Sequence, residues 1–85
     1  MFTVYVLFAP NQKKIYIGFT CDLPNRLRSH NQMGTKDWTI KFRPWELVFT
    51  EEFQTKTEAM KREKNLKGAK GRDEIWRIIK GRIHD

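Results

Sequence analysis

The apolar positions of this chain gather in three short runs that favour β-strands. Residues 2–8 and 15–20 are rich in β-branched and aromatic side chains, and a short segment typical of turns separates them. Residues 45–53 form a third run, in which every second residue from Trp45 to Phe49 is expected to share one face. The first two runs therefore predict an antiparallel hairpin, and the third predicts a further strand.

Three other segments follow helical patterns. Asp22 is expected to cap a helix that has a proline in its first turn and continues to about residue 32. Thr55 and Glu58 form the capping-box pattern that opens a second helix. Residues 70–72 break the helical pattern, and residues 73–80, which place isoleucines and a tryptophan inward, predict the last helix. The order ββαβαα thus predicts an α+β fold, with a three-stranded, mainly antiparallel sheet flanked by helices.

Length and composition agree with a small folded protein. A chain of 85 residues has room for one core, so residues 1–85 are expected to form a single domain, and a hydrophobic fraction of 39% argues against disorder. The single Cys21 cannot form an internal disulfide, which favours either a reducing cytoplasmic location or a buried thiol. No run approaches the roughly 18 apolar residues of a membrane span, so no membrane partner is expected.

The charge of the chain favours a polyanionic partner. The formal net charge is +7 and the pI is about 9.9. Clustered Lys and Arg residues at this pI are typical of nucleic-acid binding, although many small basic domains are merely soluble. Apart from the pair Lys13 and Lys14, the excess gathers in one region: Lys61, Arg62, Lys64, Lys67, Lys70 and Arg72.

Glu63 lies where an apolar residue is expected. At about 100° per residue, Ala59, Met60 and Leu66 define the apolar stripe of the second helix, and Glu63 falls inside it. An inward carboxylate has to be paired, neutralised or bound to a cation, because a bare charge in a low dielectric costs several kcal/mol. Glu63 is therefore a candidate site residue, although an intrahelical ion pair with Lys67 would also satisfy it.

The predicted hairpin brings two tyrosines to one face. If the apolar sets of its strands lie together, Tyr5, Tyr16 and Gly18 must share the opposite face. Gly18 has no side chain and would leave room for a ligand to approach the sheet. The tyrosyl hydroxyls could then bind a ligand or transfer a proton, but tyrosines paired across strands are also ordinary packing units.

The first helix carries two further candidates. Arg26 and His30 are four residues apart, so their side chains are neighbours on the helix surface, near its buried side. The planar guanidinium of Arg26 is suited to bind a phosphate, but it could equally snorkel over the sheet. His30 could be catalytic or simply a hydrogen-bonded, half-buried histidine.

Several kinds of site are excluded by the residue inventory. One Cys and two His are too few for a closed zinc site, and Gly68–Gly71 lacks the spacing of a phosphate-binding loop. The only serine, Ser29, is adjacent to His30, which makes a serine-based triad implausible. The remaining carboxylate, arginine, histidine and tyrosines suit a hard cation and phosphate chemistry, since Mg²⁺ is commonly held by one carboxylate and several waters.

These residues also resemble a known family at matching positions. Thr3-Val4-Tyr5, Tyr16-Ile17-Gly18, Arg26 ten residues after Tyr16, His30 four further on, and Lys61-Arg62-Glu63 are similar to the GIY-YIG nucleases. The similarity covers nearly the whole chain and is closest to small stand-alone proteins related to the nuclease domain of the bacterial excinuclease C subunit. Thr3 and Val4 replace the Gly and Ile of the motif, and both are compatible with a strand.

The resemblance implies a metal-dependent endonuclease that acts on nucleic acid, with DNA in repair or processing favoured over RNA. It implies that Glu63 binds Mg²⁺ or Mn²⁺, that Arg26 stabilises charge on the phosphate, and that Tyr5 rather than Tyr16 activates water, with His30 sharing that task. Gly18 would lie at the substrate, and further substrate contacts are expected from four lysines: Lys14, Lys64, Lys67 and Lys70.

Two alternatives remain open from the sequence. The chain could be a nucleic-acid-binding module with this fold and no turnover, or a nuclease subunit that needs a protein partner or a second copy of itself. The retention of Tyr5, Tyr16, Arg26 and Glu63 favours catalysis, because a pure binder has no need for an inward carboxylate.

Overall fold

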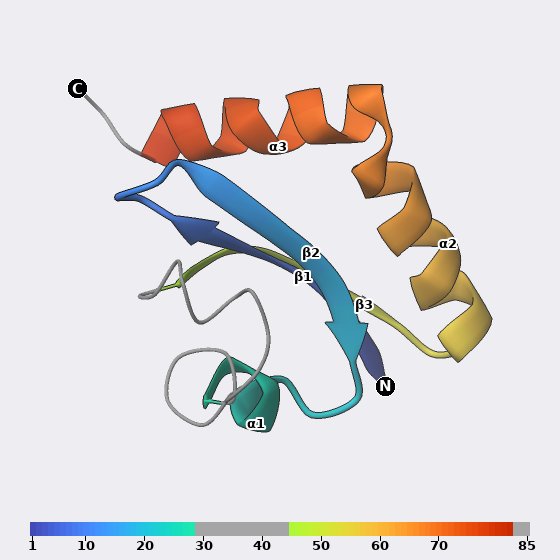
Figure 1. Cartoon of the computed structure of the whole chain (residues 1–85). Helices are drawn as coiled ribbons and strands as arrows, with labels where there is room; N and C mark the ends of the chain where they lie inside the picture. Colours follow the sequence, from blue (N-terminus) through green and yellow to red (C-terminus); the bar gives the residue numbers. More distant parts are fainter. Residues whose placement is uncertain (29–44, 83–85) are drawn as a thin grey trace.

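The computed structural model describes residues 1–28 and 45–82. The elements follow the predicted order ββαβαα: β1 (Phe2–Ala9), β2 (Lys14–Thr20), α1 (Leu23–Arg28), β3 (Glu46–Phe53), α2 (Lys56–Lys67) and α3 (Ala69–Arg82) (Figure 1). The α+β fold with a three-stranded antiparallel sheet is confirmed. None of the described helices is long and apolar enough to cross a bilayer.

The sheet has the order β2-β1-β3, and both pairings are antiparallel. The central strand β1 is buried from Val4 to Ala9, because it has a partner strand on each side and helices over both faces. The predicted hairpin is confirmed, and its turn is closed by Lys13 in the left-handed backbone region, with φ of 54°. In this register Tyr5 lies opposite Gly18.

Each face of the sheet packs against its own helical layer. On one face, side chains of β1 and β2 such as Val6 and Ile17 pack with Leu66 of α2 and Ile75 of α3. On the other face, Tyr5 and its neighbours pack with the leucines of α1. Figure 1 shows α2 and α3 on one side of the sheet and α1 on the other. The alternation of β1 therefore divides the protein into two cores.

The third strand departs from the predicted alternation. Trp45, Leu47 and Phe49 were expected on one face, but Phe49 packs with the α2 and α3 layer while Trp45 and Leu47 pack with the α1 layer. The cause is a register shift: Val6 pairs with Phe49 and the next residue, Leu7, pairs with Leu47. The extra residue is a β-bulge, which reverses the faces of all later positions in the strand.

Helix α2 begins as the sequence predicts, but its buried face is narrower than the predicted apolar stripe. Thr55 and Glu58 form the capping box, and the helix ends at Lys67. Ala59 and Leu66 are its buried residues, whereas Met60, expected in the apolar stripe, is 49% exposed. At about 100° per residue, Arg62 and Glu63 lie about 50° to either side of the direction defined by Ala59 and Leu66. One charged residue therefore flanks each side of the buried line.

The last helix begins four residues earlier than predicted, at Ala69 instead of Asp73. The segment around Gly71 looked like a break, but Gly71 is buried in the first turn of α3. A Cβ at this position would lie 2.4 Å from the carbonyl oxygen of Asn65 and 2.4 Å from the Cα of Leu66. Glycine is present here because the backbones of α2 and α3 touch.

We expect Gly71→Ala to destabilise the fold by about 1 to 3 kcal/mol, because backbone atoms of α2 cannot yield as a side chain could. Gly81→Ala is the matched control in the same helix, since a Cβ there meets nothing within 4 Å. Removing a helical glycine at such an open position should stabilise the protein by up to about 1 kcal/mol. Urea unfolding of the two variants measures both effects, and a similar change in the two would contradict this account of Gly71.

Candidate active site

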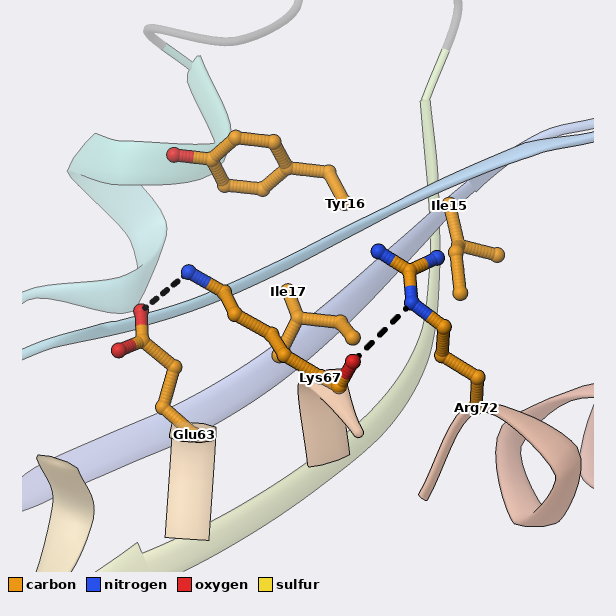
Figure 2. A pocket seen from close by; sticks show the side chains of 6 residues that line it. All are labelled: Ile15, Tyr16, Ile17, Glu63, Lys67 and Arg72. Carbon is orange, nitrogen blue, oxygen red and sulfur yellow. Dashed lines mark hydrogen bonds and ion pairs between the residues drawn. The ribbon is translucent and has the colours of Figure 1, made fainter. Parts of the chain in front are cut away.

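Three of the predicted site residues, Tyr16, Glu63 and Lys67, lie at the outer edge of β2. Because β2 is an edge strand, side chains from both faces of the sheet can reach around it. A cavity of about 230 Å³ lies there, lined by Ile15, Tyr16, Ile17, Glu63, Lys67 and Arg72. Figure 2 shows Tyr16 on one side of the strand and the α2 side chains on the other. A tyrosine from the α1 face and a carboxylate from the opposite layer therefore share one opening.

The two tyrosines form a stacked pair within an aromatic cluster. The rings of Tyr5 and Tyr16 are 6.2 Å apart with an interplanar angle of 28°, and Trp45 packs edge-on against Tyr16 at 6.2 Å. Tyr5 is buried, whereas Tyr16 is partly exposed and lines the cavity. The sequence expectation that Tyr5, Tyr16 and Gly18 share a face is confirmed.

Gly18 makes room for a side chain of the protein itself. A Cβ on Gly18 would lie 2.8 Å from the hydroxyl oxygen of Tyr5 and 3.1 Å from the Tyr16 ring. The space over this glycine, which we expected to admit a ligand, is thus filled by the Tyr5 phenol. The missing side chain allows the close approach of the two tyrosines and so determines where their hydroxyl groups lie.

Burial raises the pKa of Tyr5 well above its ordinary value of 10.0, and the neighbouring Tyr16 phenol adds to the rise. The positive charge of Arg26 opposes this rise, and the Glu63 carboxylate adds a smaller contribution in the raising direction. Arg26 and Glu63, from α1 and α2, are thus both within electrostatic range of the same phenol. Tyr5 therefore retains its proton, and of the residues singled out in the sequence Tyr16 and Glu63 line the cavity itself.

Arg26 is positioned by the short helix α1. The carboxylate of Asp22 accepts a hydrogen bond from the backbone N–H of Asn25 at 3.3 Å, which confirms the predicted cap. Leu23 and Leu27 anchor the helix on the tyrosine face of the sheet, and Arg26 is exposed at its surface. His30 and the rest of the predicted helix to residue 32 lie outside the described residues.

Glu63 is half-buried and already has a cationic neighbour. Its side chain is 22% exposed, and one carboxylate oxygen lies 3.6 Å from the ammonium nitrogen of Lys67, one helical turn away. The intrahelical ion pair considered from the sequence is therefore present. In Figure 2 the dashed line from Glu63 to Lys67 starts at one carboxylate oxygen, and the other oxygen has no dashed line to the remaining residues drawn. A cavity of about 230 Å³ has room for several waters at about 30 Å³ each, which fits a hydrated Mg²⁺ held by one carboxylate.

The described residues contain no group of three or more acidic, histidine or cysteine side chains that could enclose a metal. Glu63 lines the cavity, and a cation held by a single carboxylate keeps most of its water. The Lys67 ammonium would oppose a divalent cation at this carboxylate, because like charges repel.

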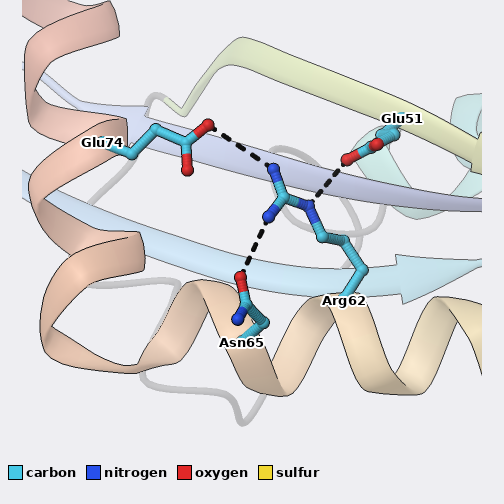
Figure 3. A network of polar contacts seen from close by, with 4 residues as sticks. All are labelled: Glu51, Arg62, Asn65 and Glu74. Atoms are coloured by element: carbon cyan, nitrogen blue, oxygen red, sulfur yellow. Dashed lines mark hydrogen bonds and ion pairs between the residues drawn. The ribbon is translucent and has the colours of Figure 1, made fainter.

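The basic region seen in the sequence is not one surface. Arg62, expected to contact phosphates, instead points into a network in which its guanidinium binds Glu51 at 2.8 Å, Asn65 at 2.9 Å and Glu74 at 3.5 Å (Figure 3). It also lies 5.9 Å above the ring centre of Phe49. Arg62 therefore joins β3, α2 and α3, and its charge is neutralised inside the fold.

The other predicted basic contacts divide between cavity and surface. Lys67 and Arg72 line the cavity, while Lys14, Lys64 and Lys70 are exposed on the surface. Sequence reasoning placed Arg72 in a general basic run and missed its position at the site, because it treated residues 70–72 as a break between helices. The glycine directly before Arg72 was the available signal, since a helical glycine often marks close backbone contact.

The chain resembles proteins that are already known. Its residues 1–76 match the sequence model of the GIY-YIG catalytic domain. A UPF0213 protein of Bacillus velezensis is 41% identical over 63 residues, which are 74% of this chain and 63% of that protein. The UPF0213 protein YazA of Bacillus subtilis is 46% identical over 48 residues, 56% of this chain and 48% of that protein. This chain thus spans less than two thirds of the length of these two relatives.

Two further similarities cover a larger share of this chain and of the protein to which it is compared. A UPF0213 protein of Staphylococcus aureus is 37% identical over 68 residues, 80% of this chain and 82% of that protein. The solution NMR structure of the UPF0213 protein BH0048 from Bacillus halodurans is 27% identical, with a TM-score of 0.55. That similarity covers 92% of this chain and 85% of the solved one.

The raised pKa of Tyr5 predicts a specific loss of stability at alkaline pH. Below the ordinary value of 10.0 the phenol is protonated in both folded and unfolded chains; above it only the unfolded chain ionises. The free energy of unfolding should therefore fall as the pH rises past 10, by at most about 1.4 kcal/mol per pH unit from this group. Urea unfolding of the wild-type protein and Tyr5→Phe, compared between about pH 8 and about pH 11, isolates this contribution. A difference between the two proteins that does not change across this range would contradict the burial argument.

Proposed function

The chain belongs to the GIY-YIG catalytic domain family, and from this premise we propose that it is a metal-dependent endonuclease that hydrolyses phosphodiester bonds in DNA during repair or processing. The observation that carries the proposal is the meeting of Tyr16, Glu63 and a cationic wall at one cavity on the edge of β2. A carboxylate can hold a metal ion, a phenol can position the attacking water, and fixed positive charge can stabilise the phosphoryl oxygens, so this set can support phosphate hydrolysis.

Glu63 would hold Mg²⁺ or Mn²⁺ through one carboxylate oxygen, in line with the half-buried position and the room beside it. The bound ion would act as a Lewis acid toward the scissile phosphate. Lys67 keeps the carboxylate compensated when no ion is bound, and it would turn toward the substrate when displaced. The Glu63 side chain therefore has a satisfied state both with and without its metal.

Arg26 would stabilise charge on the phosphoryl oxygens from the opposite side of the strand. Its exposure on α1, within electrostatic range of Tyr5, fits a side chain that contacts substrate and does not support the core. Its guanidinium presents paired N–H donors, which match the geometry of two phosphate oxygens.

Tyr16 is better suited than Tyr5 to contact the attacking water, contrary to the sequence expectation. Tyr5 is buried and retains its proton because burial raises its pKa, whereas Tyr16 lines the cavity. We assign Tyr5 the role of holding Tyr16 in place through the stacked pair. His30 stays a prediction for the same step.

The leading alternative is a nucleic-acid-binding module without turnover. One observation favours it: the ion pair with Lys67 satisfies Glu63 without any metal, so the carboxylate could be purely structural. A nuclease that needs a protein partner or a second copy of itself is a third possibility. We propose a cytoplasmic location for the protein under either nuclease hypothesis. A cleavage assay on flaps, forks, single strands and plasmid, with each metal, separates an active protein from an inactive one.

We expect Glu63→Gln to lose metal-dependent cleavage and measurable Mn²⁺ binding while the protein remains folded, because the amide keeps the shape of the carboxylate and loses its charge. Glu46→Gln, an exposed acidic residue at the start of β3, is the control that should change neither property. Cleavage by Glu63→Gln at wild-type rates and matched metal concentration would remove the metal-ligand assignment.

For Arg26→Lys we expect the turnover of bound substrate to fall by about 10²-fold, with a smaller change in affinity, because lysine retains the charge but not the two-pronged geometry. Arg28→Lys is the matched control, since both arginines are exposed on α1. Single-turnover cleavage at saturating substrate separates turnover from binding. A loss of affinity with unchanged turnover would make Arg26 a docking residue.

A further inference from the structure

Arg72 has an unusual position for a residue in the first turn of a helix. Its Nε donates a hydrogen bond to the backbone carbonyl of Lys67 at 3.2 Å, at the end of α2. In Figure 2 the two terminal nitrogens lie on the far side of the guanidinium from that carbonyl, beside Ile15. The side chain is thus held by one nitrogen and offers the other two to the cavity.

The position of Arg72 is fixed by backbone packing. Its neighbour Gly71 touches the backbone of α2 so closely that any Cβ would collide with Asn65 and Leu66. This contact places the first turn of α3 against the last turn of α2, and Arg72 follows directly. A binding residue supported in this way loses little conformational freedom when a ligand arrives.

The charge of Arg72 is not neutralised in the described structure. Arg62, its counterpart nearby, contacts two carboxylates and an amide, whereas Arg72 makes no ion pair with a described residue. In the cavity the Glu63 carboxylate is paired with Lys67, so Arg72 is the cation in excess. An unpaired guanidinium with two available nitrogens on a cavity wall is suited to bind an anion with paired oxygens.

We propose that Arg72 binds a phosphate of the polynucleotide strand next to the phosphate that is cleaved at Glu63. This inference rests on the proposed nuclease function. Glu63 and Lys67 are separated by one turn of α2, about 5.4 Å, and Arg72 is held at the carbonyl of Lys67. It therefore lies beyond the position at which Glu63 would hold its metal. Arg26 would contact the cleaved phosphate and Arg72 the neighbouring one, so that the strand runs along the edge of β2.

Two substitutions separate phosphate binding from the structural hydrogen bond. Arg72→Gln can still donate to the Lys67 carbonyl but has no charge, and Arg72→Lys keeps the charge without the fork. Arg77→Gln is the control, because Arg77 lies on the same helix, pairs with Asp73 at 3.0 Å and is 79% exposed. Urea unfolding of all three variants shows whether the fold is retained.

Binding is measured first, with fluorescent DNA oligonucleotides in metal-free buffer across a range of salt concentrations. We expect Arg72→Gln to bind about tenfold more weakly and to lower the slope of log affinity against log salt by about 0.7 to 0.9. Arg72→Lys should restore the slope, and Arg77→Gln should change neither quantity. An unchanged slope in a folded Arg72→Gln protein would show that Arg72 only joins α2 to α3.

Cleavage in the presence of metal is measured second and locates the cut. Affinity is then measured on oligonucleotides in which one phosphate at a time is replaced by a neutral methylphosphonate. At one position beside the cut, the methylphosphonate should lower the affinity of the wild-type protein. The same replacement should leave the affinity of Arg72→Gln unchanged, because that variant already lacks the contact, as a double-mutant cycle requires. The absence of any such position would overturn the proposal. A protein that cuts nothing but shows the charge-dependent slope would instead refute the nuclease assignment and keep the phosphate site.

Discussion

The pairing of Tyr5 with Gly18 across β1 and β2 fixes the arrangement on which the rest of the protein depends. A shift of this register by one residue would exchange the two faces of β2, because successive side chains of a strand point in opposite directions. The isoleucines that pack under α2 would then face α1, and Tyr16 would leave the cavity. The tight fit of the Tyr5 phenol over Gly18 resists that slip, so one contact defines both the core and the candidate site.

The bulge in β3 and the network around Arg62 form a second, linked constraint. By reversing the faces of the strand, the bulge places Phe49 and Glu51 on the side of α2. Arg62 can then lie over the ring of one and bind the carboxylate of the other. Its further contact with Glu74 extends to α3. A half-buried arginine with partners on three elements fixes their relative positions, since loss of any partner would leave a charge poorly compensated.

The sequence was sufficient for the elements whose patterns are local. The hairpin, the capping box and the cap at Asp22 depend on neighbouring residues, and all of them are found where expected. The face of Phe49 could not be predicted, because a bulge depends on how a strand fits its partner. The predicted first residue of α3 was wrong, because the glycine at position 71 is required by contact with the backbone of α2 and a local sequence pattern does not reveal such a contact.

The same distinction applies to the candidate site. Alternation correctly predicted the tyrosine face, and periodicity led to Glu63, which the structure places beside the buried line of α2. Periodicity could not tell Arg62 from Arg72. Both are basic residues in one charged stretch, and only their tertiary surroundings differ: one is enclosed by acidic groups and the other lies on a cavity wall. Met60 shows a related limit, since only two residues of α2 are buried, Ala59 and Leu66, and two positions define an apolar stripe too loosely to exclude a neighbour.

The ion pair between Glu63 and Lys67 has a consequence for how the protein would respond to its surroundings. Because the ammonium is attached one helical turn away, its effective concentration at the carboxylate does not depend on the protein concentration, although salt would weaken the pair. A divalent ion that binds Glu63 competes with this tethered cation, which works as a built-in threshold. Metal would occupy the site only when its free concentration exceeds that threshold, and a substrate phosphate that draws Lys67 away would lower it. In the proposed nuclease, metal and nucleic acid would then favour each other's binding through the single side chain of Lys67.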